Sequence, residues 1–213
     1  MLTFFKVRTA YSLMWIFLSA IILSGCAASY TPIRPEARKY TDSYHSPDSS
    51  ITYAYKYDVL SIMGNKRYSK KEQKAGFSVL AVRIQNNTDS AIKFSSLKVF
   101  HGNKEVIPLN NLAAANKVKQ GVIPYVLYSL LVLYVNQGTR IENGRIEQDY
   151  MTIPIGIPIA VGNMVGAGAA NTNLRKEFLK YDISSKSINP NETVYGIMVL
   201  QGLDHQPLRF ESR

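Results

Sequence analysis

The sequence predicts a mainly β, α+β fold: an antiparallel β-sandwich interrupted by an apolar helical insertion at about 111–180. Two observations predict it. Short segments rich in β-branched and aromatic residues recur at regular spacing, and clusters of Asn, Pro, Gly and Ser separate them. About 70 residues in the middle of the chain break this pattern, with long uncharged runs and small residues at helical spacing.

The chain begins with a segment typical of a secreted protein. Lys6 and Arg8 make it positively charged, and the apolar run at 11–23 is 13 residues long, too short to span a bilayer upright. The run ends in the word Leu23–Cys26, and Cys26 is the only cysteine of the chain. We therefore predict a signal peptide at 1–25. An ordinary signal peptide with a chance cysteine and an uncleaved anchor are the alternatives.

The word Leu23-Ser24-Gly25-Cys26 resembles the lipobox of bacterial lipoproteins, including those of Bacteroidetes. The resemblance implies that a signal peptidase recognises Leu23, Ser24 and Gly25, and that the Cys26 thiol carries a diacylglycerol group. Two or three acyl chains hold a protein to a membrane permanently, because each buried methylene contributes about 0.8 kcal/mol. The residue after Cys26 is Ala27 rather than aspartate, and no acidic run follows. By resemblance to known sorting rules, this implies the outer membrane, with the protein facing the periplasm.

Residues 26–50 are predicted to be the lipidated cysteine and a flexible tether. They contain Pro32, Pro35 and Pro47 and few aliphatic side chains, so they bury too little apolar surface to offset their ordering entropy. A coil of this length spans about 27 Å root-mean-square, which would hold the folded part clear of the membrane. The mature chain would have 188 residues and a net charge of about +8, because the leader removes two cations from the formal +10.

The folded part at 51–213 is predicted to form one β-sandwich domain. In the first strand, alternation places Ile51, Tyr53, Tyr55 and Tyr57 on one face. The segment 77–84 is apolar and β-branched enough for a central strand. The strands are predicted at 51–60, 77–84, 91–100, 105–109, 183–188, 193–200 and 208–210.

A cluster of basic residues follows the first strand, broken only by Glu72. It consists of Lys66, Arg67, Lys70, Lys71 and Lys74. We predict a solvated hairpin loop between two strands. The alternative is a patch that binds an anionic partner such as lipid headgroups, lipopolysaccharide or a wall polymer. The predicted compartment argues against nucleic acid as that partner.

The insertion is predicted to be largely helical. Asn110 and Asn111 are expected to cap a short helix at 112–119, and a second helix is expected at 124–137, with Pro124 in its first turn. A polar loop or hairpin at 139–148 and an extended stretch at 151–160 lead to a last helix, which runs to about 179.

Small residues recur every fourth position at the start of that last helix. Gly162, Gly166 and Ala170 form a stripe that allows two helices to approach closely. We predict that the two apolar helices form a hairpin, which packs on itself and on the sandwich with Gly162 and Gly166 at the contact. A hairpin that enters the membrane or binds a second membrane protein is the alternative.

Two sequence words refine the fold prediction. Val82-Arg-Ile-Gln-Asn-Asn-Thr88 and Ile188-Asn-Pro-Asn-Glu-Thr-Val-Tyr-Gly-Ile197 resemble strand ends and turns in immunoglobulin-like domains of bacterial lipoproteins. The resemblance covers about 100 residues and implies an antiparallel immunoglobulin-like β-sandwich, interrupted by the helical insertion. Its motifs are structural, so it implies a fold and no activity.

Residue patterns that carry catalysis are missing from the sequence. His45, His101 and His205 are far apart, and none has a second ligand at metal spacing. No nucleophile elbow, phosphate loop or dinucleotide motif occurs, and the acidic residues are scattered. We therefore predict no catalytic residues, no cofactor and no metal.

The sequence favours a lipid-anchored envelope protein that acts as a non-enzymatic interaction or accessory module. Its partners would be the membrane, through the lipid on Cys26, and another protein of the envelope. The first alternative is a lipoprotein that binds a lipid or a glycan in a pocket between its tyrosine-rich face and the insertion. An envelope hydrolase is the third hypothesis, because a fold can still assemble a pair of scattered carboxylates.

Overall fold

The computed structural model describes residues 27–212, which form a mixed α+β fold with antiparallel sheets. Strand and helix are equally abundant, at about 34% and 33%, so the predicted mainly β composition is wrong. The chain divides into two compact units. Unit 1 contains Gly121–Ala169 and the described residues up to Ser29, and unit 2 contains Tyr30–Gln120 and Ala170–Arg213.

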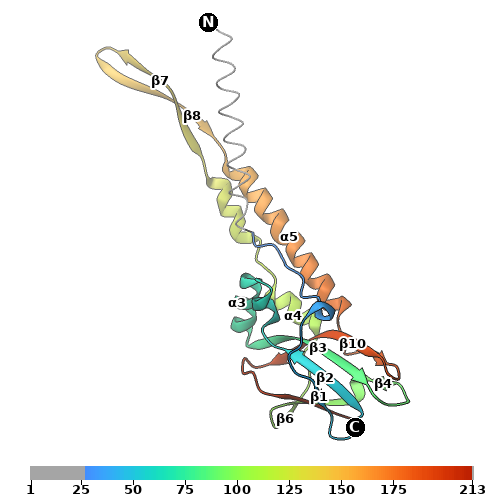
Figure 1. Cartoon of the computed structure of the whole chain (residues 1–213). Helices are drawn as coiled ribbons and strands as arrows, with labels where there is room; N and C mark the ends of the chain where they lie inside the picture. The colour runs from blue at the N-terminus through green and yellow to red at the C-terminus, as the bar shows by residue number, and fades with distance from the viewer. Residues whose placement is uncertain (1–26, 213) are drawn as a thin grey trace. The chain divides into compact units, whose positions relative to one another are not determined.

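The larger sheet of unit 2 has four strands in the order β1-β2-β3-β10 (Figure 1). Strand β3 is central, as the sequence predicts, because its side chains are buried on both faces along the stretch 77–82. The strands are β1 (Tyr44–His45), β2 (Ile51–Lys56), β3 (Phe77–Asn86) and β10 (Thr193–Gln201).

One face of this sheet shares a core with a smaller sheet of order β11-β5-β6. Leu80 and Val82 of β3 are buried in one cluster with Val99 and Phe210 of the smaller sheet. The strand predicted at 91–100 is split by a 3₁₀ turn. The elements here are β4 (Ile92–Lys93), η3 (Phe94–Ser96), β5 (Leu97–His101), β6 (Lys104–Val106), β9 (Ser187–Ile188) and β11 (Leu208–Ser212).

Helices cover the other face of the larger sheet. Val79 of β3 and Val199 of β10 belong to a second buried cluster with Tyr68, Val118 and Phe178 from three different helices. Unit 2 therefore has a helical layer that the predicted sandwich does not include, and the immunoglobulin-like form of its sheets stays a prediction. The helices of unit 2 are α2 (Val59–Ile62), α3 (Lys66–Ala75), α4 (Asn111–Val118) and the last part of α5 (Gly156–Lys180).

The segment predicted to be a flexible tether is packed on unit 2 from Tyr30 onward. Tyr30, Ile33 and Pro35 are buried, a short 3₁₀ helix forms at η2 (Pro35–Ala37), and β1 pairs with β2. The tether prediction is wrong here because it considered only local composition. A few apolar side chains suffice when the rest of the fold provides a surface for them.

Unit 1 contains η4 (Ile123–Leu130), the hairpin of β7 (Leu133–Glu142) and β8 (Arg145–Ile153), and the first part of α5. The helix predicted at 124–137 is wrong: it is a 3₁₀ segment followed by a strand. The hairpin itself was expected, and Asn143 and Gly144 make its turn, both with positive φ. The predicted last helix is confirmed, but it begins at Gly156, so the extended stretch predicted at 151–160 is wrong from there on. Pro158 does not prevent this, because it lies in the first turn of the helix.

Two asparagine side chains stabilise α4 and the junction between the two ends of the insertion. The Asn110 side chain caps α4 by accepting the backbone N–H of Ala113 at 2.9 Å, as predicted. The Asn171 side chain pairs with the backbone of Gln120, accepting its N–H at 2.7 Å and donating to its carbonyl at 2.9 Å. This double hydrogen bond joins the two ends of the insertion. None of the helices within residues 27–212 has the length and apolarity needed to cross a membrane.

Candidate functional site

The residues that follow the predicted anchor are held on unit 2 by one carboxylate. Glu177 of α5 is buried and accepts the backbone N–H groups of Ile33 at 2.9 Å and Arg34 at 2.8 Å, together with the Tyr30 hydroxyl. Arg34 has a φ of 47°, in the left-handed region, and this conformation presents two consecutive N–H groups to the same side chain. Burial, followed by the charge of Glu177, raises the pKa of Tyr30 far above its usual range. We call this arrangement the Glu177 clasp.

A second link lies beside the clasp, at the end of α5. The Tyr181 hydroxyl donates to Glu36 Oε1 at 2.6 Å and accepts from Lys180 Nζ at 2.9 Å. Burial acts to raise the pKa of Glu36, but the hydrogen bond from Tyr181 and the nearby cations outweigh it, so the pKa lies below its usual value. Glu36 therefore stays ionised as an acceptor for the tyrosine.

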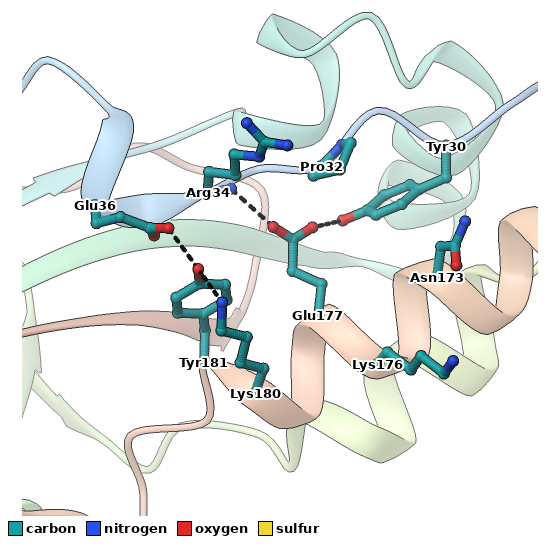
Figure 2. Close-up of a pocket in the computed structure, with 9 residues that line it drawn as sticks. All are labelled: Tyr30, Pro32, Arg34, Glu36, Asn173, Lys176, Glu177, Lys180 and Tyr181. Carbon is teal, nitrogen blue, oxygen red and sulfur yellow. Dashed lines mark hydrogen bonds between the residues drawn. The ribbon is translucent and has the colours of Figure 1, made fainter.

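The clasp and the second link border an open hollow of about 470 Å³. Figure 2 shows its lining, with Glu177 reaching from α5 toward Tyr30 and the Arg34 backbone. The residues that line it are Tyr30, Pro32, Arg34, Glu36, Asn173, Lys176, Glu177, Lys180 and Tyr181. Since the Glu177 carboxylate already accepts three hydrogen bonds, its role in this hollow is to hold the chain. Arg34, Lys176 and Lys180 outnumber the two carboxylates of the lining, so its net charge favours an anion.

The predicted basic cluster lies on a helix. Lys66, Arg67, Lys70, Lys71 and Lys74 all belong to α3, so the hairpin-loop prediction is wrong. The sequence does not show the aliphatic periodicity of an amphipathic helix here, because the buried side of α3 carries Tyr68 and Glu72 instead of aliphatic residues. All five cations are at least partly exposed, while Glu72, the only acid of the helix, is buried.

Helix α4 extends this basic surface. It packs against α3, and Lys71 Nζ donates to the backbone carbonyl of Lys119 at the end of α4. Lys117 and Lys119 are exposed, and α4 contains no acid. The sequence did not group them with the others, because more than 40 residues separate them. We call the seven side chains the basic face: Lys66, Arg67, Lys70, Lys71, Lys74, Lys117 and Lys119.

A smaller hollow of about 330 Å³ is lined by Asp58, Glu72 and His205, which the sequence did not group together. Asp58 Oδ1 lies 3.3 Å from His205 Nε2, and the His205 ring stacks on Tyr57. Glu72 also borders this hollow and accepts the N–H of Val79 at 2.6 Å. Burial raises the pKa of Glu72 to about 7, although the hydrogen bond from Val79 acts against it. Within residues 27–212, no cluster of His, Cys, Asp or Glu has the arrangement of a metal site.

The tyrosine-rich face of β2 holds the end of the chain in place. The hydroxyls of Tyr53 and Tyr57 donate to the carbonyls of Leu208 and Gln206 at 3.1 and 2.7 Å. The Tyr55 hydroxyl accepts the N–H of Leu208 at 3.2 Å. These groups fix β11 on the larger sheet, so the tyrosines expected to line a ligand pocket have structural partners instead.

The glycines predicted to lie at a helix contact are exposed. Gly162 and Gly166 are both on the exposed side of α5, and a Cβ on Gly166 would meet only Ala27 Cβ, at 3.4 Å, among the described residues. In unit 1, close packing requires a glycine at Gly156, where a Cβ would lie 1.9 Å from the carbonyl oxygen of Tyr128. The contact in unit 1 is therefore between η4 and the first residue of α5.

Leu23, Ser24, Gly25 and Cys26, the residues predicted to form a lipobox, lie outside the described residues. No family model, no curated protein and no solved structure matches this chain.

Proposed function

We propose that this chain is a lipid-anchored envelope lipoprotein that acts as a non-enzymatic interaction or accessory module. In this proposal, acyl chains on Cys26 hold it to the outer membrane, facing the periplasm, and an envelope protein is its partner. The observation that carries the proposal is the Glu177 clasp, because it fixes the chain to unit 2 directly after the lipobox word.

The clasp changes what the anchor does. Tyr30 is only four residues after Cys26, and a fully extended chain of that length reaches about 14 Å. The Tyr30 side chain is buried in unit 2. A lipid on Cys26 would therefore hold unit 2 close to the headgroups, rather than at the end of a long tether. Such a position suits a module that works at the membrane surface.

The basic face is the surface that we assign to an anionic partner. Seven cations are displayed by two packed helices whose only acid is buried, so the local field is strongly positive. Phosphate groups of lipids or lipopolysaccharide, and acidic surfaces of envelope proteins, all have the complementary charge.

The fold supports an immunoglobulin-like origin for the two sheets of unit 2. We propose that β2, β3 and β10 correspond to strands A, B and E, and that β5, β6 and β11 correspond to C, C′ and F. The observed order β2-β3-β10 in one sheet and β11-β5-β6 in the other agrees with this assignment. The insertion would then separate C′ from E.

A second candidate function is the binding of a lipid or glycan headgroup. The hollow beside the clasp favours it, because about 470 Å³ is within the size range of ligand sites and Arg34, Lys176 and Lys180 line it. Native mass spectrometry of the lipidated protein, released in mild detergent, tests this candidate. A retained ligand that is lost in Lys176→Gln/Lys180→Gln would support it.

The anchor is tested by labelling cells with a radioactive or alkyne-tagged fatty acid. The parent protein should be labelled, and Cys26→Ala should lose all label and remain an uncleaved precursor. A labelled Cys26→Ala protein would refute the lipid anchor.

The basic face is tested with two variants of equal net charge. Lys66→Gln/Lys70→Gln/Lys74→Gln removes three cations from the face, and Lys39→Gln/Lys93→Gln/Lys104→Gln removes three exposed cations elsewhere. We expect only the first variant to lose in-cell crosslinks to its partner and binding to anionic vesicles. Equal losses in both would show that total charge, rather than the basic face, matters.

A further inference from the structure

Charge is distributed very unevenly in unit 1. Within 121–169 every charged residue lies in the ten residues at the end of the β7–β8 hairpin, and the stretches 121–139 and 150–169 contain none. The hairpin end is well suited to water, since it carries charged side chains of both signs and Arg140 pairs with Asp149 at 3.2 Å. We call the two uncharged stretches, 121–139 and 150–169, the uncharged body.

The uncharged body exposes large apolar side chains on both of its helical segments. In η4, Ile123, Leu127 and Leu130 are 79%, 69% and 76% exposed. In α5, Ile157, Val161 and Val165 are 54%, 54% and 66% exposed, and their spacing of four residues places them on one helix face. The opposite face of this part of α5 buries Ile159 and Ala167. A helix that is apolar all round is typical of a protein interior or of a membrane.

The predicted anchor point is attached to this same part of α5. The backbone N–H of Ala27 donates to Asn163 Oδ1 at 2.7 Å, and the Asn163 amide group donates to the Ile159 carbonyl at 2.9 Å. Asn163 is the only polar side chain between Gly156 and Ala169. Because Cys26 directly precedes Ala27, acyl chains on its thiol would begin one residue, about 3.8 Å of chain, from this contact.

We propose that the uncharged body of unit 1 is a second membrane contact, whose apolar side chains on η4 and α5 enter the acyl region beside the lipid on Cys26. This inference rests on the proposed lipid anchor. The occupant is lipid because the exposed apolar face continues from the residue that follows the acylated cysteine. The stretch 156–169 is about 21 Å long as a helix and the hydrocarbon core is about 30 Å thick, so α5 lies in the leaflet rather than across it.

The consequence for the anchor is an added hydrophobic contact and a fixed orientation. A lipid alone leaves a protein free to rotate about its attachment, whereas buried side chains on a helix face do not. The charged end of the β7–β8 hairpin would remain in water. Tyr150, which is exposed, directly follows Asp149 in β8, and Tyr134, also exposed, lies further from the charges in β7, opposite Thr152. Tyrosine favours this boundary between apolar and aqueous regions.

Tryptophan fluorescence tests this contact directly, because the only tryptophan of the chain is Trp15, ahead of Cys26. We would place single tryptophans at Leu127→Trp and Val165→Trp in the lipidated full protein, with Leu203→Trp as the matched control. Leu203 is an apolar side chain of unit 2 that is 48% exposed. The proteins are reconstituted into phosphatidylethanolamine–phosphatidylglycerol vesicles whose acyl chains carry bromine.

We expect the tryptophans at 127 and 165 to lose about half of their fluorescence or more, and the tryptophan at 203 to lose almost none. Vesicle-bound, lipidated protein with equal quenching at all three sites would overturn the membrane contact while leaving the anchor in place. A protein that carries no fatty acid and does not float with vesicles would refute the anchor instead. Weak quenching combined with crosslinks between two copies through position 165 would assign the surface to a dimer, and would also overturn the inference.

A second measurement needs no substitution. Met164 is exposed in the uncharged body, and Met63 is partly exposed in unit 2. Peroxide oxidises accessible methionine to the sulfoxide, which mass spectrometry detects. The oxidation rates of the two methionines are compared in the lipidated protein before and after its reconstitution into vesicles. Oxidation of Met164 should slow severalfold on reconstitution and that of Met63 should not, whereas equal rates would contradict the contact.

Discussion

Removal of the Glu177 carboxylate should release the segment that follows the anchor. Glu177→Ala leaves the N–H groups of Ile33 and Arg34 and the Tyr30 hydroxyl without their acceptor. A hydrogen bond to a charged group contributes about 1.5–3 kcal/mol, and water can reach the open hollow to replace part of what is lost. Taking the low end for three bonds, we expect the free energy of unfolding to fall by about 4 kcal/mol.

The assay combines urea unfolding with limited trypsin digestion at Arg38 and Lys39, just after the clasped segment. Glu177→Ala should speed cleavage there, and Glu177→Gln, which keeps one carbonyl acceptor, should give an intermediate result. The control is Glu36→Ala, which removes an exposed carboxylate with one hydrogen bond from Tyr181 and should cost under about 1 kcal/mol. If Glu177→Ala behaved like this control, the clasp would not be what holds the segment.

Three further changes test other parts of the structure. Burial raises the pKa of Glu72 from 4.5 to about 7, so stability that is present below about pH 4.5 should be lost as pH rises through 7, by about 3 kcal/mol. Glu72→Gln should abolish this decline in urea titrations at several pH values, and an unchanged slope would exclude Glu72 as its source. Gly156→Ala should lower the free energy of unfolding by about 1–3 kcal/mol or more, because its Cβ would clash with a backbone carbonyl. Gly166→Ala should be neutral or should raise that free energy by up to about 1 kcal/mol. Asn86, fully buried, donates to three carbonyls, so Asn86→Ala should cost about 2–4 kcal/mol by chemical denaturation, with the exposed Asn87→Ala as the milder control.

The strands of unit 2 were largely predictable, because each has a local pattern. The segment 77–84 is apolar on both faces and became the central strand β3, and the turn at 101–104 joins β5 to β6 as expected. The hairpin loop predicted for the basic segment 66–74 was wrong, because the local pattern of this segment is misleading. Five cations suggested a solvated loop, although Lys, Arg, Glu, Gln and Ala are all good helix formers. Its buried side is made of Tyr68 and Glu72, which no apolar count detects.

The candidate site was not predictable from local sequence. Glu177 lies more than 140 residues from the backbone groups that it binds, and nothing near Tyr30 or Ile33 indicates a distant carboxylate. The composition of 26–50 correctly indicates that this segment has too few apolar side chains to form a core of its own. It gives no information about the surface of unit 2 on which the segment packs. The helix contact predicted at the glycine stripe was wrong for a similar reason, since periodic small residues allow a close contact without requiring one. Gly156, which is required, stands outside the stripe.

The pairing of Asn171 with the backbone of Gln120 has a consequence for how the chain is connected. It brings together the two ends of a 49-residue excursion, Gly121–Ala169, so unit 2 is assembled from two separate stretches of sequence. Folding of unit 2 must close this long loop, and a linker of about six residues would lower the closure entropy cost by about 2 kcal/mol. A shortened chain in which such a linker replaces the excursion should therefore fold at least as readily as the parent. That outcome would make the excursion a detachable module of the domain that carries it.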